Sequence, residues 1–169
     1  MKAKHIIALV GILLFFAGSV FVLHKASTAL HQKEERYATF PDFHLPDLDG
    51  EMVSDVSIDS NKATVFYFFD PDCNLCVVML DSLNKRHADF SDYQVLLLTI
   101  LSKEKIKEFV DKADFRLSEN IKILFDENAE LISVLDVKGA PTSLIYKDAK
   151  LIKRFDGPVT VETLIKYLQ

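Results

Sequence analysis

The two cysteines of this 169-residue chain, Cys73 and Cys76, form a C-x-x-C pair directly after the apolar run ATVFYFF. Such a pair can be a redox centre, supply two ligands to a metal, or form a structural crosslink. The residues that follow have helical spacing, so the pair is predicted at the first turn of a helix. There the free N–H groups and the helix dipole stabilise the thiolate of Cys73. Cys73 is therefore expected to attack a disulfide, and the more buried Cys76 to resolve the mixed disulfide.

The two other roles for the cysteines have less support in the sequence. A disulfide across so short a loop removes little entropy from the unfolded chain, which argues against a structural crosslink. A zinc site needs about four ligands, and the chain has neither a second C-x-x-C nor paired histidines. We therefore expect no metal and no other cofactor.

Buried strands and helices alternate around the cysteines. Residues 62–70 read as a strand buried on both faces. The segments YQVLLLTIL and IKILFD repeat this pattern and are followed by helices, which predicts crossovers and a largely parallel sheet. Turn signals at 49–50 and 148–149 predict a hairpin before and after this core, and Thr160 is expected to cap the last helix. The expected fold class is α/β, with a central mixed sheet flanked by helices.

An apolar segment precedes this domain. Residues 6–23 carry no charge, and at about 1.5 Å per residue they span roughly the hydrocarbon core of a bilayer. We predict a transmembrane anchor in residues 1–24, with a cleaved signal peptide as the alternative, then a stalk (25–39) and the domain (40–169). Lysines flank both ends, so the positive-inside rule does not fix the orientation. A short N-terminus before a large domain is typical of a signal anchor, which predicts an extracytoplasmic, periplasmic domain.

The order strand, C-x-x-C helix, strand, helix, strand, helix, GAPT, hairpin, helix resembles the thioredoxin superfamily. More narrowly, residues 40–169 resemble the membrane-anchored thiol-disulfide oxidoreductases of the TlpA and ResA type, which are related to the AhpC/TSA and redoxin group. FPDFHLPDLDGEMVSD matches the N-terminal hairpin of that family. The resemblance implies a cis peptide bond at Pro141, beside the cysteines. It also implies that Ala140, Pro141 and Thr142 bind an extended substrate segment by β-augmentation.

The sequence departs from this family at positions that tune the cysteines. Asp72 replaces the usual tryptophan before the first cysteine, and the chain has no tryptophan at all. Met79 and Tyr67 replace the buried acids of related proteins, which leaves no evident proton acceptor for Cys76. Asp70 and Asp72 also place negative charge beside the first cysteine, which opposes its thiolate.

The expected function is that of an anchored enzyme that exchanges disulfides with protein substrates and with an upstream redox partner. The absence of a cation between the cysteines favours a reductase over an oxidant. Three alternatives stay open: a thiol peroxidase of the peroxiredoxin type, a copper carrier of the Sco type, and a redox-inert binding module. The peroxidase motif P-x-x-x-[TS]-x-x-C is absent, with Asp70 at its hydroxyl position, and so is the Sco pattern C-x-x-x-C. A formal net charge of −5 argues against a nucleic-acid partner.

Overall fold

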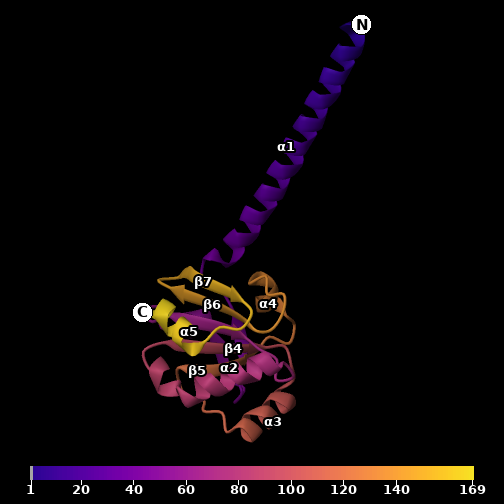
Figure 1. Ribbon diagram of the computed structural model, residues 1–169. Coiled ribbons are helices and arrows are strands. Elements are labelled where there is room, and N and C mark those ends of the chain that lie inside the picture. Colours follow the sequence, from indigo (N-terminus) through magenta and orange to yellow (C-terminus); the bar gives the residue numbers. More distant parts are fainter. Residues whose placement is uncertain (1) are drawn as a thin grey trace. The chain divides into compact units, whose positions relative to one another are not determined.

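The computed structural model describes residues 2–169, except for the side chains of residues 2–10, 12, 13 and 29–34. The chain divides into two compact units, one ending at Arg36 and one formed by residues 37–169. Helix α1 (Lys2–Ala38) accounts for the first unit (Figure 1). Among the residues that the structure describes, no helix is both long and apolar enough to cross a membrane. Of the predicted anchor, residues 1–24, residue 1 and the side chains of residues 2–10, 12 and 13 lie outside that description.

The second unit is built on a mixed five-stranded sheet with the strand order β5-β4-β3-β6-β7 (Figure 1). The strands β3, β4 and β5 run parallel, whereas β6 is antiparallel to both β3 and β7. The predicted central mixed sheet is therefore confirmed. The strand bounds are β3 (Thr64–Phe68), β4 (Gln94–Thr99), β5 (Ile121–Phe125), β6 (Thr142–Lys147) and β7 (Lys150–Asp156).

Two turns close hairpins where the sequence predicts them. β1 (His44–Pro46) and β2 (Met52–Ser54) pair as a separate antiparallel sheet, and Gly50 between them has a φ of 92°. Asp148 and Ala149 both have positive φ between β6 and β7, as a tight turn with the twist of a hairpin requires.

The helices after α1 are α2 (Asn74–Lys85), α3 (Lys103–Ala113), α4 (Glu130–Val134) and α5 (Val161–Leu168), with short 3-10 helices η1 (Asp55–Ser57) and η2 (His87–Phe90).

The two faces of the sheet carry separate hydrophobic clusters. Val65 and Tyr67 of β3 contribute to one cluster, and Phe66 and Phe68 to the other, because successive side chains of a strand point to opposite faces. Residues of α2, α3 and α5 pack in the Tyr67 cluster, whereas α4 and the β1–β2 hairpin contribute to the Phe66 cluster. Coverage of both faces explains why this strand is buried along its whole length.

The strand order brings the C-x-x-C segment next to the GAPT segment. The chain leaves β3 at Phe68 and reaches the cysteines within a few residues. β6 runs in the opposite direction, and its first residue, Thr142, pairs with Phe68. Residues 139–141 therefore lie at the C-terminal end of β3, where the segment with the cysteines also begins.

A chain that begins at Tyr37 is expected to fold by itself. The Tyr146 hydroxyl donates to the Tyr37 carbonyl oxygen at 2.7 Å, and the Arg154 guanidinium lies 4.8 Å from the centre of the Tyr37 ring. We expect residues 37–169 to unfold in one cooperative transition, with a free energy of unfolding about 1 kcal/mol above that of residues 40–169. Denaturant titration followed by circular dichroism measures both. A fragment 37–169 without a cooperative transition would show that the fold needs residues of the first unit.

Candidate active site

Cys73 lies at the N-terminal end of α2. It is the residue that caps the helix, with φ −89° and ψ 109°, and its Sγ accepts a hydrogen bond from the Cys76 N–H at 3.4 Å. The backbone N–H of Cys73 donates to the Asp70 carbonyl oxygen at 3.0 Å, which holds the preceding turn. The sulfur therefore lies where the unpaired N–H groups of a helix favour negative charge. Cys73 is half-buried, and both cysteines are free thiols.

The GAPT segment contacts Cys73 through its backbone. The Ala140–Pro141 peptide bond is cis, and the Cys73 thiol donates to the Ala140 carbonyl oxygen, with 3.8 Å between Sγ and oxygen. Thr142 Oγ1 donates to the Gly139 carbonyl oxygen at 2.7 Å and so fixes the turn from within. The structure thus brings the five residues predicted for the site to one edge of the sheet: Cys73, Cys76, Ala140, Pro141 and Thr142.

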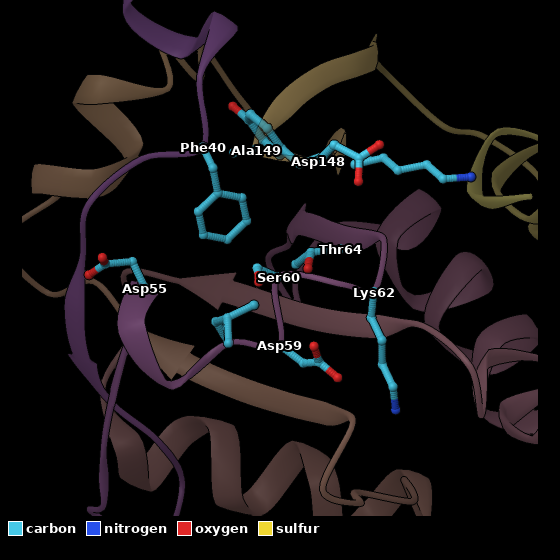
Figure 2. A pocket seen from close by; sticks show the side chains of 11 residues that line it. Phe40, Asp55, Asp59, Ser60, Lys62, Thr64, Asp148 and Ala149 are labelled. Atoms are coloured by element: carbon cyan, nitrogen blue, oxygen red, sulfur yellow. The ribbon is translucent and has the colours of Figure 1, made fainter.

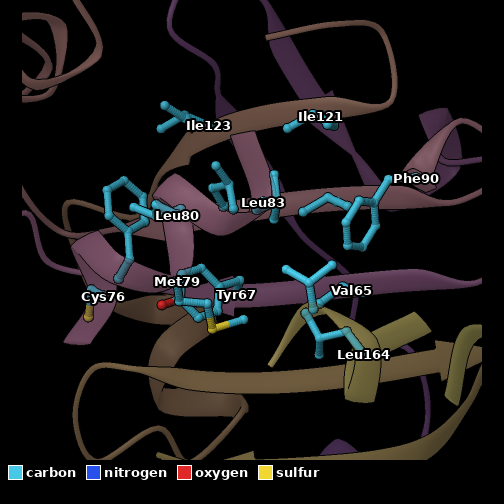
Figure 3. Close-up of a cluster of buried hydrophobic side chains, with 14 of the residues drawn as sticks. Val65, Tyr67, Cys76, Met79, Leu80, Leu83, Phe90, Ile121, Ile123 and Leu164 are labelled. Carbon is cyan, nitrogen blue, oxygen red and sulfur yellow. The ribbon is translucent and has the colours of Figure 1, made fainter. Parts of the chain in front are cut away.

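Cys76 is completely buried, whereas Cys73 is partly exposed. Cys76 belongs to the Tyr67 cluster under α2, together with Met79 and Leu80 (Figure 3). Burial, together with the neighbouring Cys73 thiol, raises the pKa of Cys76 to about 12, against the lowering effect of the Asp70 backbone N–H and the Tyr67 side chain. At neutral pH Cys76 is therefore a protonated thiol. This asymmetry of exposure fits an attacking Cys73 and a resolving Cys76.

A lysine far away in the sequence compensates one of the two aspartates beside Cys73. Lys105 Nζ lies 2.6 Å from Asp72 Oδ2, and both side chains are substantially exposed. The Asp70 carboxylate accepts a hydrogen bond from the Asp72 N–H at 2.8 Å and so stabilises the turn before Cys73. The sequence predicts the opposing negative charges but not this cation, because 33 residues separate the partners. The helical pattern of α3 places Lys105 on an exposed face without indicating what it contacts.

Substitution of Lys105 by glutamine is expected to slow the attack of Cys73 on a disulfide by about two- to threefold at low ionic strength, because the Asp72 carboxylate then lacks its counter-charge. Initial rates with a disulfide substrate measure the effect, and salt should reduce it. The double variant Lys105→Gln/Asp72→Asn should regain the rate of the unaltered chain. A slow double variant would mean that Lys105 acts otherwise than through Asp72.

The pocket in Figure 2 lies away from the cysteines. It has a volume of about 80 Å³, and Phe40, Lys62, Thr64 and Tyr146 are among the residues that line it. Thr64 begins β3, so the pocket lies at the end of that strand opposite to the cysteines. Within the part of the chain that the structure describes, no group of three or more His, Cys, Asp or Glu residues is placed to bind a metal.

Solved structures of similar fold come from several bacteria. No curated protein matches the sequence. StoA from Bacillus subtilis has 17% identity and a TM-score of 0.65, with 78% of this chain and 99% of StoA covered. A secreted disulfide oxidoreductase from Mycobacterium tuberculosis, homologous to E. coli DsbE, has 20% identity and a TM-score of 0.63 (80% and 97% covered). The exposed lipoprotein thioredoxin Etrx1 from Streptococcus pneumoniae has 23% identity and a TM-score of 0.65 (76% and 98% covered).

These likenesses confirm the predicted thioredoxin-like fold. The family model described as AhpC/TSA matches residues 37–156, which include both cysteines and the GAPT segment. This match covers most of the chain, and the chain therefore belongs to the AhpC/TSA family.

Proposed function

We propose that this protein is a thiol-disulfide oxidoreductase that acts on disulfides of other proteins. The observation that carries the proposal is the position of Cys73: its Sγ lies at the N-terminal end of α2 and contacts the Ala140 carbonyl, and the buried thiol of Cys76 follows one turn later. This arrangement gives one accessible sulfur that can attack and a second that can attack only the first.

The reaction follows from these two roles. The Cys73 thiolate attacks one sulfur of the substrate disulfide, the substrate S–S bond breaks, and the departing substrate thiolate takes up a proton. Cys76 then loses its proton and attacks Cys73 Sγ, so the mixed disulfide breaks and the second substrate thiolate leaves. The substrate gains two electrons, and the Cys73–Cys76 pair becomes a disulfide. An upstream dithiol partner must reduce this disulfide before the next turnover.

The surface around Cys73 supports a protein substrate. Leu75 and Val78 of α2 are 54% and 65% exposed, and both line a groove that α2 shares with the segment leading into α5. Exposed apolar side chains of this size favour contact with another protein. We propose that Ala140, Pro141 and Thr142 bind an extended segment of that protein by backbone pairing, next to the disulfide under attack.

The direction that we propose is reduction of the substrate. A strong oxidant needs a reduced form that is stabilised by a low thiol pKa. Here Asp70 and Asp72 place negative charge beside Cys73, and no cation lies between the two cysteines. Equilibration of the pair with glutathione or dithiothreitol buffers gives its reduction potential. We expect a value near that of thioredoxin, about −270 mV, and a value near about −120 mV would reverse the direction.

A thiol peroxidase is the second candidate, because the solved structures of similar fold include the peroxidoxin BcpB from Mycobacterium tuberculosis. Two assays on the same preparation distinguish the candidates. The oxidoreductase reduces the interchain disulfides of insulin with a dithiol as electron donor, and the peroxidase consumes hydrogen peroxide with the same donor. Rapid peroxide consumption without insulin reduction would overturn the proposal made above.

We further propose that the domain works outside the cytoplasm and is attached to a membrane through residues 6–23. The proposal rests on the uncharged stretch as a whole, including the side chains that lie outside the described part. It is supported by similar proteins that are described as secreted or exposed. The full chain should sediment with membranes and resist extraction by carbonate, whereas residues 37–169 should stay in solution. A full chain released by carbonate would contradict the anchor.

A further inference from the structure

The hydroxyl of Tyr67 is buried without a hydrogen-bond partner. Tyr67 lies in β3 with no exposed surface, and within the described part of the chain its oxygen is one of two buried side-chain polar atoms that lack a partner. A buried hydroxyl that makes no hydrogen bond costs free energy, and phenylalanine would fill the same space without that cost. Such a group calls for a specific explanation.

The second unpartnered atom points to the same region. It is the hydroxyl of Ser143, which lies directly opposite Tyr67 in the pairing of β3 with β6. Residues paired across two strands project from the same face of the sheet. Both hydroxyls therefore lie on the face that α2 covers, and Ser143 follows Pro141 by two residues. The unpaired polar groups thus gather behind the cysteines and the cis-proline.

Tyr67 is the one of the two that acts on Cys76. Both residues belong to the cluster under α2, and Figure 3 shows the Tyr67 oxygen on the side of the ring toward Cys76. Burial and then the nearby sulfur raise the pKa of Tyr67, while Tyr67 itself works to lower the pKa of Cys76. The titratable side chains that act on Cys76 are Cys73 and Tyr67, and the Asp70 backbone N–H is the other donor. Tyr67 is thus a neutral phenol that can donate a hydrogen bond.

We propose that the Tyr67 hydroxyl donates a hydrogen bond to the Cys76 sulfur when this sulfur is a thiolate, and that it is a catalytic residue for the resolving step. The proposal rests on the disulfide exchange proposed above. A thiol or a disulfide sulfur is a weak acceptor, which explains why the hydroxyl has no partner in the resting dithiol. A thiolate is charged and accepts a much stronger hydrogen bond.

The donor stabilises charge and does not take a proton. During resolution the Cys76 proton leaves to solvent, the Tyr67 O–H bond stays intact, and the Cys76 thiolate displaces the substrate thiolate from Cys73. When an upstream thiolate later attacks Cys73 Sγ, Cys76 leaves as a thiolate and accepts the same hydrogen bond. Tyr67 therefore occupies the place of a buried acid with a different chemistry: it lowers the cost of the anion without acting as a base.

Stopped-flow mixing of the reduced full chain with excess dithiobis(nitrobenzoate) separates the two steps. Attack by Cys73 releases the first nitrothiobenzoate, and resolution by Cys76 releases the second. We expect Tyr67→Phe to slow the second phase about tenfold at every pH between about 6 and 9, and to leave the first phase unchanged. The slope of log rate against pH should stay the same, because the loss corresponds to a raised pKa of Cys76.

Two matched variants test whether the effect is specific. Tyr146→Phe removes the hydroxyl of another buried tyrosine, which lies in the Phe66 cluster on the other face of the sheet. That hydroxyl donates to the Tyr37 carbonyl oxygen, and its removal should leave both phases unchanged. Ser143→Ala removes the neighbouring unpartnered hydroxyl. An unchanged second phase in Tyr67→Phe, equal slowing of both phases, or slowing in Ser143→Ala alone would each overturn the role of Tyr67. Failure of the unaltered chain to show any second phase would instead overturn the proposed function.

The substitution should not disturb the fold, because it deletes a hydroxyl that has no partner. The free energy of unfolding of Tyr67→Phe should equal or exceed that of the unaltered chain, whereas Tyr146→Phe should lose stability. If Tyr67→Phe does not fold, incorporation of 3-fluorotyrosine keeps every hydroxyl and makes it a stronger donor. A faster second phase then supports the proposal, and an unchanged rate overturns it.

Discussion

Replacement of Cys73 by serine is expected to lower the rate of disulfide reduction by at least about a thousandfold, whereas Cys76→Ser should stop the reaction at a mixed disulfide. A serine hydroxyl at residue 73 cannot provide a thiolate, and the remaining Cys76 is completely buried and protonated at neutral pH. In Cys76→Ser the accessible sulfur of Cys73 can still attack, but no second sulfur lies one turn away to release the substrate.

The two variants are compared by insulin reduction and by mass spectrometry of the adducts that form with a disulfide substrate. Cys76→Ser should carry one covalent adduct, located on Cys73 and released by dithiothreitol. The double variant Cys73→Ser/Cys76→Ser is the matched control and should carry none. An adduct on Cys76 in the Cys73→Ser variant would exchange the two roles, and full activity in either single variant would refute the enzyme that we propose.

The sheet could be predicted because its central strands carry an unambiguous signal. β3 is buried at all five positions, and such a strand reads as a continuous apolar run. The sequence predicts a helix from Cys73, and the helix begins at Asn74 with Cys73 as its capping residue. The turn at 148–149 was visible as well, although aspartate and alanine rather than glycine take the positive φ values there.

The contacts of the site were less accessible to sequence reasoning, because they join distant segments. The contact between Cys73 and Ala140 spans 67 residues, and only the resemblance to a family predicts it, since GAPT alone indicates a turn. The ion pair of Lys105 with Asp72 had no sequence signal at all. The sequence shows Tyr67 in the place of an acid, but the lack of a partner for its hydroxyl depends on the packing of α2 against β3.

Resolution by Cys76 is expected to be slow near neutral pH and to accelerate about tenfold per pH unit between about pH 6 and 9. Burial and the neighbouring Cys73 thiol raise the pKa of Cys76 to about 12. Only the thiolate attacks, and well below the pKa its fraction rises tenfold with each unit of pH. The second phase of the stopped-flow reaction measures this dependence. A rate that does not change with pH would show that a group inside the protein already accepts the proton.

Introduction of a carboxylate near Cys76 should remove much of this pH dependence. Met79 lies one turn after Cys76 in α2, is 4% exposed and belongs to the same buried cluster. In Met79→Glu a carboxylate can take the proton as Cys76 attacks, and general bases of this kind contribute about a hundredfold or more. We expect resolution at about pH 7 to accelerate about a hundredfold. Met79→Gln, which has the same size but no basic group, should resolve no faster than the unaltered chain.

The same substitution makes a prediction about stability. Burial raises the pKa of the introduced carboxyl above the value of about 4.3 that it has in the unfolded chain. The folded state then binds the proton more tightly, so the free energy of unfolding of Met79→Glu should fall relative to Met79→Gln as pH rises from about 4 to 7. Denaturant titrations at several pH values measure this difference. If the two variants lose stability in parallel and resolve at equal rates, the introduced carboxyl lies in water, which would contradict the burial of position 79 beside Cys76.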